Sequence, residues 1–317
     1  MKQVLLLLTL LCACTVCRAE DEVTFAEKLG WPKGAKVVVI HVDDVGMSHS
    51  SNLGAIKTMT EGVASSCAIM MPCSWVSEYA HYLQKNPGAD AGLHLTMTSE
   101  WRDYRWGPVA GKGAVPGMVD AEGCMWPSVL AVNVNASADE VEKEILAQLD
   151  RAVTMGIEPT HLDSHMGTLF SPKFVDRYIK VGIDKHIPVL FPGGHLQYIG
   201  GSAPVTPEYI RAKAKQLWDA GLPVVDDIMN DSYGWKPEEK VDNYIKVFKE
   251  MKPGVTYVIC HASDPTCEFE KITDSGPSRK GDMDALTDPR VKQALVDEKV
   301  IVTTMRELKE RREKVGK

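Results

Sequence analysis

The chain has 317 residues, of which 44% are hydrophobic and 25% are charged, so it can form a large globular core and is neither disordered, a coiled coil nor a mini-protein. It contains 36 Lys and Arg residues and 43 Asp and Glu residues, which give a formal net charge of -7. The basic residues form no cluster of the kind that neutralises phosphates, so we expect no nucleic-acid partner.

The first 19 residues have the layout of a secretory signal peptide. Lys2 precedes an apolar run, and the small residue Ala19 ends the segment. We therefore expect a secreted or periplasmic protein with a single domain over residues 20–317. The alternative is a lipoprotein anchored through Cys14, which ends the sequence Leu-Cys-Ala-Cys. No later segment has the roughly 20 apolar residues that a membrane-spanning helix needs, so we expect no transmembrane segment.

Short β-branched segments alternate with helical segments through the rest of the chain. We expect strands at Lys36–Val42, Ser65–Met71, Ala91–Thr96, Thr160–His165, Ile187–Phe191, Leu222–Asp226, Val255–Cys260 and Val300–Thr303. The clearest helix is Ser137–Met155, in which Ser137 and Glu140 form a capping box. Further helices are expected at Ser171–His186, Thr206–Ala220, Pro237–Met251 and Asp288–Val296.

This alternation, with strands that are almost continuously apolar, indicates parallel strands covered by helices. Eight such strands favour an α/β fold with a single-domain, irregular (β/α) TIM-like barrel. The alternative is an open doubly wound sheet, but no GxGxxG motif follows the first strand. Between the third strand and the first clear helix, Trp101–Trp126 form an aromatic-rich insertion loop, and long loops in compact domains are often functional.

Polar residues gather at the carboxyl ends of five predicted strands. They are Asp43, Asp44, His94, His161, Asp163, His165, Asp227 and His261. In (β/α) barrels this edge holds the active site. Each residue also has a purely structural alternative, as a helix cap, a buried histidine with its hydrogen bonds satisfied, or a polar group at a strand end.

Three of these residues have the chemistry of a metal site. Asp44, His94 and His165 form a ligand set suited to Zn²⁺ or a similar divalent ion, with a position open for water. Successive residues of a strand point in different directions, so Asp43 would be free to serve as a base.

The remaining polar residues suit supporting roles around such a site. His161 and Asp163 would orient the metal ligands. His261 is a natural proton donor near neutral pH, since it lies outside the ligand set. Arg279 and Asp282 form either a surface ion pair or a charge relay that positions an active-site group.

The insertion loop carries aromatic residues with two open interpretations. Trp101 and Trp106 lie there beside Arg102 and Arg105. They form either part of the core or a platform that stacks on sugar rings.

Five cysteines lie outside the leader, so at least one thiol is free or pairs between chains. Pairs between Cys67 and Cys73 or between Cys260 and Cys267 are alternatives. We interpret these residues mainly as small, buried apolar side chains.

Four segments, in this order along the chain, resemble a known family. They are His41–Ser48 (HVDDVGMS), Gly62–Ser66 (GVASS), Gly92–Thr96 (GLHLT) and Thr160–His165 (THLDSH). Together with Ala285–Pro289 they are similar to the YdjC-like (ChbG/HpnK) carbohydrate deacetylases, metal-dependent relatives of the polysaccharide deacetylases. The resemblance extends from about Lys36 to Leu308. The chain departs from many relatives at Gly167 and Phe191, where they carry His and Arg.

The resemblance implies an irregular (β/α) barrel, a carbohydrate substrate and one divalent metal ion, with Zn²⁺ favoured and Mg²⁺ or another ion as the alternative. Asp44, His94 and His165 would bind the metal, Asp43 would be the base and His261 the general acid. The implied reaction removes the acetyl group of an N-acetylated amino sugar or oligosaccharide. The metal and Asp43 would activate water to attack the acetamide carbonyl, and His261 would protonate the departing amine.

Two other functions are alternatives. A glycoside hydrolase on a similar barrel would use two carboxylates, such as Asp43 and Asp227, on either side of a glycosidic bond. A secreted carbohydrate-binding protein would use a structural metal and the aromatic loop. The sequence does not fix the oligomeric state, and a homodimer is compatible with it.

Overall fold

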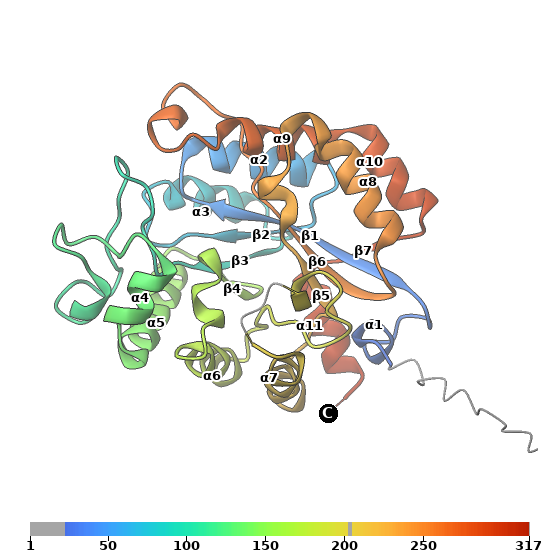
Figure 1. The fold of residues 1–317 in the computed structure, drawn as a ribbon, viewed down its shortest axis with the longest axis horizontal. Helices are drawn as coiled ribbons and strands as arrows, with labels where there is room; N and C mark the ends of the chain where they lie inside the picture. Colours follow the sequence, from blue (N-terminus) through green and yellow to red (C-terminus); the bar gives the residue numbers. More distant parts are fainter. Residues whose placement is uncertain (1–22, 202–204, 317) are drawn as a thin grey trace, which may run out of the picture.

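The computed structural model describes residues 23–201 and 205–316. The expected signal peptide and Cys14 lie outside the described residues. Within them the chain forms an α/β fold in which a parallel sheet curves into a half-barrel and helices cover it (Figure 1).

The sheet is built around its first strand. Its members are β1 Lys36–Val45, β2 Ser66–Ile69, β3 Ala91–Leu95, β4 Leu162–Ser164, β5 Asp227–Met229, β6 Gly254–Cys260 and β7 Ile301–Val302. Their order is β4-β3-β2-β1-β6-β5, and β7 pairs with β1 off this path. All of these pairs are parallel. β1 is central because it is apolar on both faces: Val38 and Ile40 belong to one buried cluster, Val37 and Val39 to another.

Two predicted strands differ in the structure. Ile187–Phe191 forms no regular strand, only isolated bridges at Val189 and at the adjoining Pro192. Prolines in and beside the segment lack the amide hydrogen that a continuous ladder needs. The strand expected at Leu222–Asp226 lies instead at β5, Asp227–Met229. A complete eight-stranded barrel is therefore not confirmed.

The helices confirm the sequence pattern more closely. They are α1 Phe25–Lys28, α2 His49–Thr60, α3 Val76–Lys85, α4 Val129–Asn135, α5 Ala138–Thr154, α6 Val175–Lys185, α7 Pro207–Asp219, α8 Lys240–Glu250, α9 Gly276–Thr287, α10 Pro289–Asp297 and α11 Met305–Lys314. The five predicted helices correspond to α5, α6, α7, α8 and α10. The capping box of Ser137 and Glu140 is present at the start of α5. Among the described residues, no helix is both long enough and apolar enough to span a bilayer.

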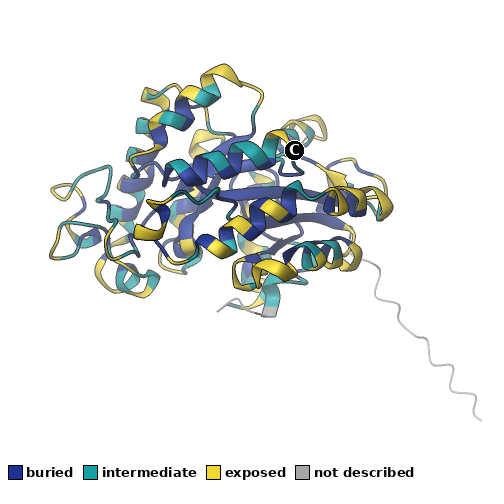
Figure 2. Ribbon diagram, turned by 90° about the horizontal axis from the view of Figure 1, so that it is seen from above, coloured by how far each residue is buried: buried dark blue, intermediate teal, exposed yellow. Residues whose placement is uncertain are grey.

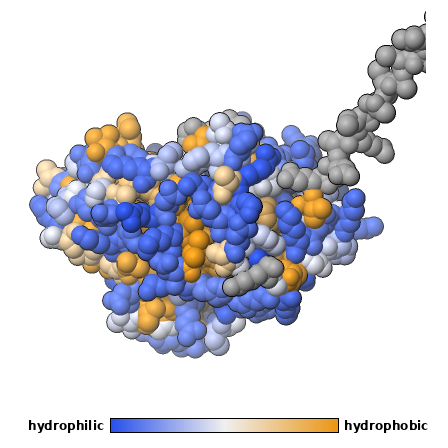
Figure 3. All heavy atoms as spheres, turned by 90° about the horizontal axis from the view of Figure 1, so that it is seen from below, coloured by the Kyte–Doolittle hydropathy of each residue, from blue (hydrophilic) through white to orange (hydrophobic). Residues whose placement is uncertain are grey.

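Short 3-10 helices occupy several connections. They are η1 Pro116–Met118, η2 His165–Phe170, η3 Ile199–Gly201, η4 Asp231–Gly234, η5 Pro237–Glu239 and η6 Phe269–Lys271. The connection from β3 to α4, which holds the expected insertion loop, contains η1 and an isolated bridge between Val119 and Met125. Buried residues follow the strands and the inner faces of the helices (Figure 2). The face seen from below is mostly hydrophilic, with apolar areas between (Figure 3).

Candidate metal centre and active site

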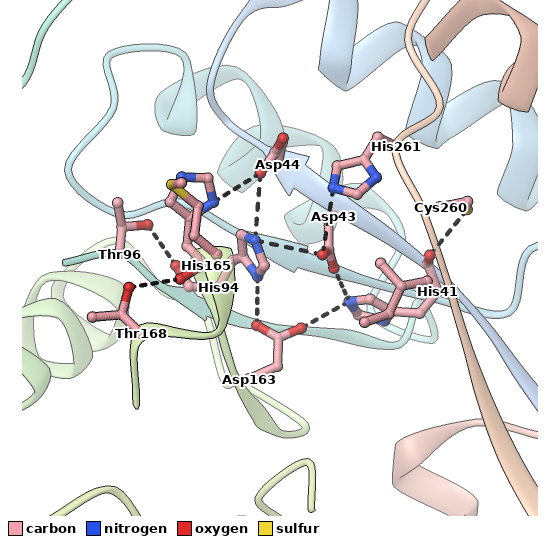
Figure 4. Close-up of polar contacts among 12 residues, drawn as sticks. His41, Asp43, Asp44, His94, Thr96, Asp163, His165, Thr168, Cys260 and His261 are labelled. Carbon is pink, nitrogen blue, oxygen red and sulfur yellow. Dashed lines mark hydrogen bonds and ion pairs between the residues drawn. The ribbon is translucent and has the colours of Figure 1, made fainter. Parts of the chain in front are cut away.

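The end of β1 brings two neighbouring carboxylates to one centre. Asp44 has a φ of 64°, in the left-handed region that residues other than Gly rarely adopt. The pairing of β1 with β2 shifts its register at the same place, between Val42 and Val45. This irregularity turns both carboxylates toward His94, whose Nε2 lies 3.6 Å from Asp43 Oδ2 and 3.4 Å from Asp44 Oδ1 (Figure 4).

The three predicted metal ligands meet at this point. Asp44 Oδ1 lies 3.4 Å from His94 Nε2 and 3.2 Å from His165 Nδ1, and all three residues are buried. Asp44 Oδ1 has no hydrogen-bond partner among the described residues. A buried carboxylate oxygen that has no hydrogen bond and faces two imidazole nitrogens is a suitable environment for a cation. The donor set of two nitrogens and one oxygen therefore fits a divalent metal.

Each of the two candidate ligand histidines is held by a carboxylate on its other nitrogen. His94 Nδ1 lies 2.7 Å from Asp163 Oδ1, and His165 Nε2 lies 3.1 Å from both oxygens of Glu100. A carboxylate accepts the hydrogen of that nitrogen, which leaves the opposite nitrogen to ligate. Asp163 thus has the orienting position expected from the sequence. Glu100 was not predicted, because it lies in the irregular connection after β3 and has no strand-end pattern.

Neighbouring opposite charges shift the pKa values of Asp44, His94 and His165 toward their charged forms. Burial alone would raise the pKa of Asp44, but Arg279 and the two histidines hold it well below its usual value. Burial would lower the pKa of His94, but Asp43 and Asp163 raise it well above the usual value. Burial would also lower the pKa of His165, but the carboxylates of Glu100 and Asp44 outweigh this effect and raise the pKa to about 9. Both histidines must therefore lose a proton before they bind a metal.

Arg279 has a different partner from the one expected. Its Nη1 lies 2.7 Å from Asp44 Oδ2, and both side chains are buried. Asp282 instead pairs with Lys240 at 2.7 Å and accepts the backbone N–H of His261 at 3.0 Å. A surface ion pair between Arg279 and Asp282 was therefore the wrong expectation. Both residues project from α9, and each holds a different group of the centre in place.

In Figure 4, Asp43 contacts both His94 and His261. His261 Nε2 is 3.8 Å from Asp43 Oδ2. Burial and the nearby Arg279 lower its pKa, and the carboxylates around it only partly oppose this shift. His261 is therefore neutral near pH 7. The ring of Tyr233 packs edge-on against it, with 4.9 Å between the ring centroids.

A second histidine network lies beneath the centre. His41 is fully buried, and its Nε2 lies 3.2 Å from Asp43 Oδ1 and 3.0 Å from Asp163 Oδ2. His161 is also buried; its ring nitrogens contact Tyr257 and Thr160, and its ring packs edge-on against His41, with 5.1 Å between the centroids. The orienting role expected for His161 stays a prediction. His41 was assigned no role from the sequence. Its position two residues before Asp43 in a strand, where alternate residues share a face, is the signal that could have identified it.

Four of these groups form the polar end of a cavity of about 680 Å³. Asp43, His94, Asp163 and His261 line it together with mainly apolar residues. A cavity of this size falls in the range of small-molecule sites.

Two tryptophans and one aspartate predicted for the site lie outside the cavity lining. Trp106 is buried, and its Nε1 donates to the carbonyl of Thr98 at 2.8 Å. Trp101 packs edge-on against Trp106 and lies 5.9 Å from the Arg279 guanidinium. Asp227 is buried and accepts the backbone N–H groups of Tyr198 and Ile228. Stacking on sugar by the two tryptophans stays a prediction.

The described cysteines are all free. Cys67, Cys73 and Cys260 are buried, as expected for small apolar side chains, whereas Cys267 is exposed. Neither alternative disulfide is present.

Known proteins resemble this chain in sequence and in fold. A carbohydrate deacetylase from Thermus thermophilus is 31% identical over 271 residues, which cover 86% of this chain and 93% of that protein. A chitooligosaccharide deacetylase from Yersinia enterocolitica is 28% identical over 160 residues, 49% of this chain and 58% of that protein. A crystal structure from Enterococcus faecalis, of a protein with a proposed role in cellobiose-phosphate cleavage, has a TM-score of 0.72 at 19% identity and covers 86% of this chain and 99% of its own. The family model of the YdjC-like proteins matches residues 37–297, so the chain belongs to the YdjC-like family.

Proposed function

We propose that this protein is a metal-dependent carbohydrate deacetylase that removes the acetyl group of an N-acetylated amino sugar or oligosaccharide and releases acetate. The observation that carries the proposal is the convergence of Asp44, His94 and His165 beside Asp43 and His261 at one cavity. The relatives from Thermus and Yersinia, which are named as carbohydrate and chitooligosaccharide deacetylases, support the same reaction and substrate class.

Asp44, His94 and His165 would hold the metal, and their mixed nitrogen and oxygen donors favour Zn²⁺. A bound divalent ion would polarise the acetamide carbonyl and lower the pKa of a water molecule. Arg279 keeps Asp44 ionised for this role, and Asp163 and Glu100 fix the orientation of the two imidazoles.

Asp43 is the proposed base. Its Oδ2 faces both His94 and His261, at 3.6 Å and 3.8 Å, while its Oδ1 is held near His41. Asp43 would take one proton from the attacking water. Because His261 is neutral in the resting protein, it would receive this proton through Asp43 and deliver it to the nitrogen as the C–N bond breaks. The proton removed from water thus ends on the amine nitrogen, and the acyl group leaves with the water hydroxyl as acetic acid, which ionises to acetate.

The alternative of a glycoside hydrolase is less consistent with the site. The two carboxylates of such an enzyme must both face the glycosidic bond. Asp227 instead directs its carboxylate oxygens to backbone amides and lies outside the cavity lining. We further propose a secreted or periplasmic location from the leader pattern of residues 1–19, with a lipid anchor at Cys14 as the alternative.

The proposal is tested by acetate release from a panel of N-acetylated and O-acetylated saccharides. The assay is run on the protein as purified, after chelation, and with single divalent metals added back. We expect release from N-acetylated amino sugars that stops on chelation and returns with one metal. Chelator-resistant cleavage of a glycosidic bond would favour a hydrolase, and sugar binding with no acetate would favour a binding protein.

A further inference from the structure

The cavity that holds the catalytic groups has two chemically different sides. Asp43, His94, Asp163 and His261 form its polar end. Much of the rest is what we term the apolar wall, which consists of Phe170, Leu190, Phe191, Ile228 and Ile259. Within the apolar wall, the rings of Phe170 and Phe191 meet edge-on, with 5.9 Å between their centroids.

The apolar wall is poorly suited to a bare sugar. A hydroxyl group transferred from water to an apolar surface without a hydrogen-bond partner costs free energy. Outside the catalytic end, the polar side chains of the lining are Asn133, Ser164, Ser171, Tyr209 and Asn230, and the other lining residues are apolar. The volume of about 680 Å³ is in the range that holds ligands of drug size, larger than a single monosaccharide. The space beyond the polar end therefore suits an apolar part of the substrate.

The lining also lacks the groups that recognise an anion. Among the described residues that line the cavity, none is Lys or Arg, and two are carboxylates, Asp43 and Asp163. Arg279 does not line the cavity, and its Nη1 is directed at Asp44. Phosphate recognition in proteins depends on cationic or backbone donors. Of the residues that line this end, the carboxylates Asp43 and Asp163 would repel a phosphate, and no Lys or Arg of the lining would attract it.

We propose that the substrate is an uncharged N-acylated amino sugar that bears an apolar substituent, which packs against the apolar wall. This inference rests on the proposed deacetylase function and deepens it. The apolar substituent has two chemical sources, an aglycone at the anomeric carbon or an acyl chain longer than acetyl on the nitrogen.

The test compares four substrates on the metal-loaded protein by release of free amine. They are N-acetylglucosamine, its 6-phosphate, its phenyl β-glycoside, and N-hexanoylglucosamine. We expect kcat/KM to be at least about tenfold higher for the phenyl glycoside or the hexanoyl sugar than for N-acetylglucosamine, since each methylene in an apolar pocket contributes roughly tenfold or more. The derivative with the higher kcat/KM identifies the position of the apolar substituent. We expect the phosphate to be the poorest of the four.

Two variants link the preference to the apolar wall. Ile259→Ala removes side-chain carbons from it, so we expect the gain from the apolar substituent to fall. Leu130→Ala changes an exposed apolar residue that does not line the cavity and should leave the gain as it is in the wild-type protein. A phosphate that reacts as well as its parent, apolar derivatives no better than the parent, or an unchanged gain in Ile259→Ala would each overturn the inference while the deacetylase function stands. No amine from any of the four substrates would instead overturn the proposed function.

Discussion

A buried ion pair beside the active site offers a quantitative test of how the centre is held. Lys240 on α8 and Asp282 on α9 are 0% and 1% exposed, and Lys240 Nζ lies 2.7 Å from Asp282 Oδ1. The same oxygen accepts the hydroxyl of Tyr244 at 2.8 Å, and Asp282 Oδ2 accepts the backbone N–H of His261 at 3.0 Å. The pair therefore ties two helices to the strand end that carries His261.

The substitution Lys240→Met keeps the length of the side chain but leaves the carboxylate of Asp282 buried without its cation. Breaking one partner of a buried ion pair costs about 3–5 kcal/mol. The hydrogen bonds from Tyr244 and from the amide of His261 remain, so we expect the lower end, about 3 kcal/mol. The free energy of unfolding is measured by urea denaturation, as a lower midpoint at an unchanged slope.

Two further variants make the test specific. Lys236→Met removes an exposed lysine that pairs with Glu239, and it should leave the unfolding midpoint unchanged within error. In the double variant Lys240→Met/Asp282→Asn the buried charge is gone, so we expect it to recover part of the stability lost by Lys240→Met alone. A double variant no more stable than Lys240→Met would refute the reasoning, as would a Lys240→Met protein as stable as the control.

Three other predictions concern the centre and its surroundings. Metal affinity should rise with pH up to about 9, because His165, with a pKa of about 9, and His94, with a raised pKa, lose protons on binding; calorimetry in buffers of different ionisation heat should detect the protons released. Gly92→Ala should cost roughly 1–3 kcal/mol in urea denaturation, because its Cβ would lie 2.5 Å from the His161 ring, and a stable variant would contradict the packing described. Among the described cysteines, Cys267 should react fastest with a thiol reagent in the folded protein, and mass spectrometry that finds a buried cysteine modified first would contradict the burial pattern.

Much of the candidate site is predictable from sequence because the carboxyl ends of parallel strands meet at one edge of a sheet. Asp43 and Asp44 lie at the end of one apolar run, and His94 and His165 lie at the ends of two others, which is enough to bring them together. The backbone of Asp44 is not predictable in this way. Its left-handed conformation lets two neighbouring carboxylates face one centre, although residues in a regular strand alternate.

The sequence predictions that the structure contradicts have identifiable physical causes. The strand expected at Ile187–Phe191 has the right residue types but is interrupted by prolines that remove ladder donors. Arg279 and Asp282 are three residues apart on α9, a spacing that favours pairing, yet each finds a buried partner from another part of the chain. Glu100 lies in a connection without regular structure, where no periodicity indicates the direction of a side chain. Such contacts depend on tertiary packing and not on local pattern.

The central claim is that one centre divides metal binding and proton transfer between different residues. The measurement that tests it most directly is metal content per chain together with amine release for the wild-type protein, Asp43→Asn and His94→Ala, with the exposed His81→Ala as the control histidine variant. We expect Asp43→Asn to keep its metal and lose about 10²–10⁴-fold in turnover, His94→Ala to lose the metal and activity together, and His81→Ala to match the wild type. Equal metal content and equal loss of activity in Asp43→Asn and His94→Ala would contradict the account.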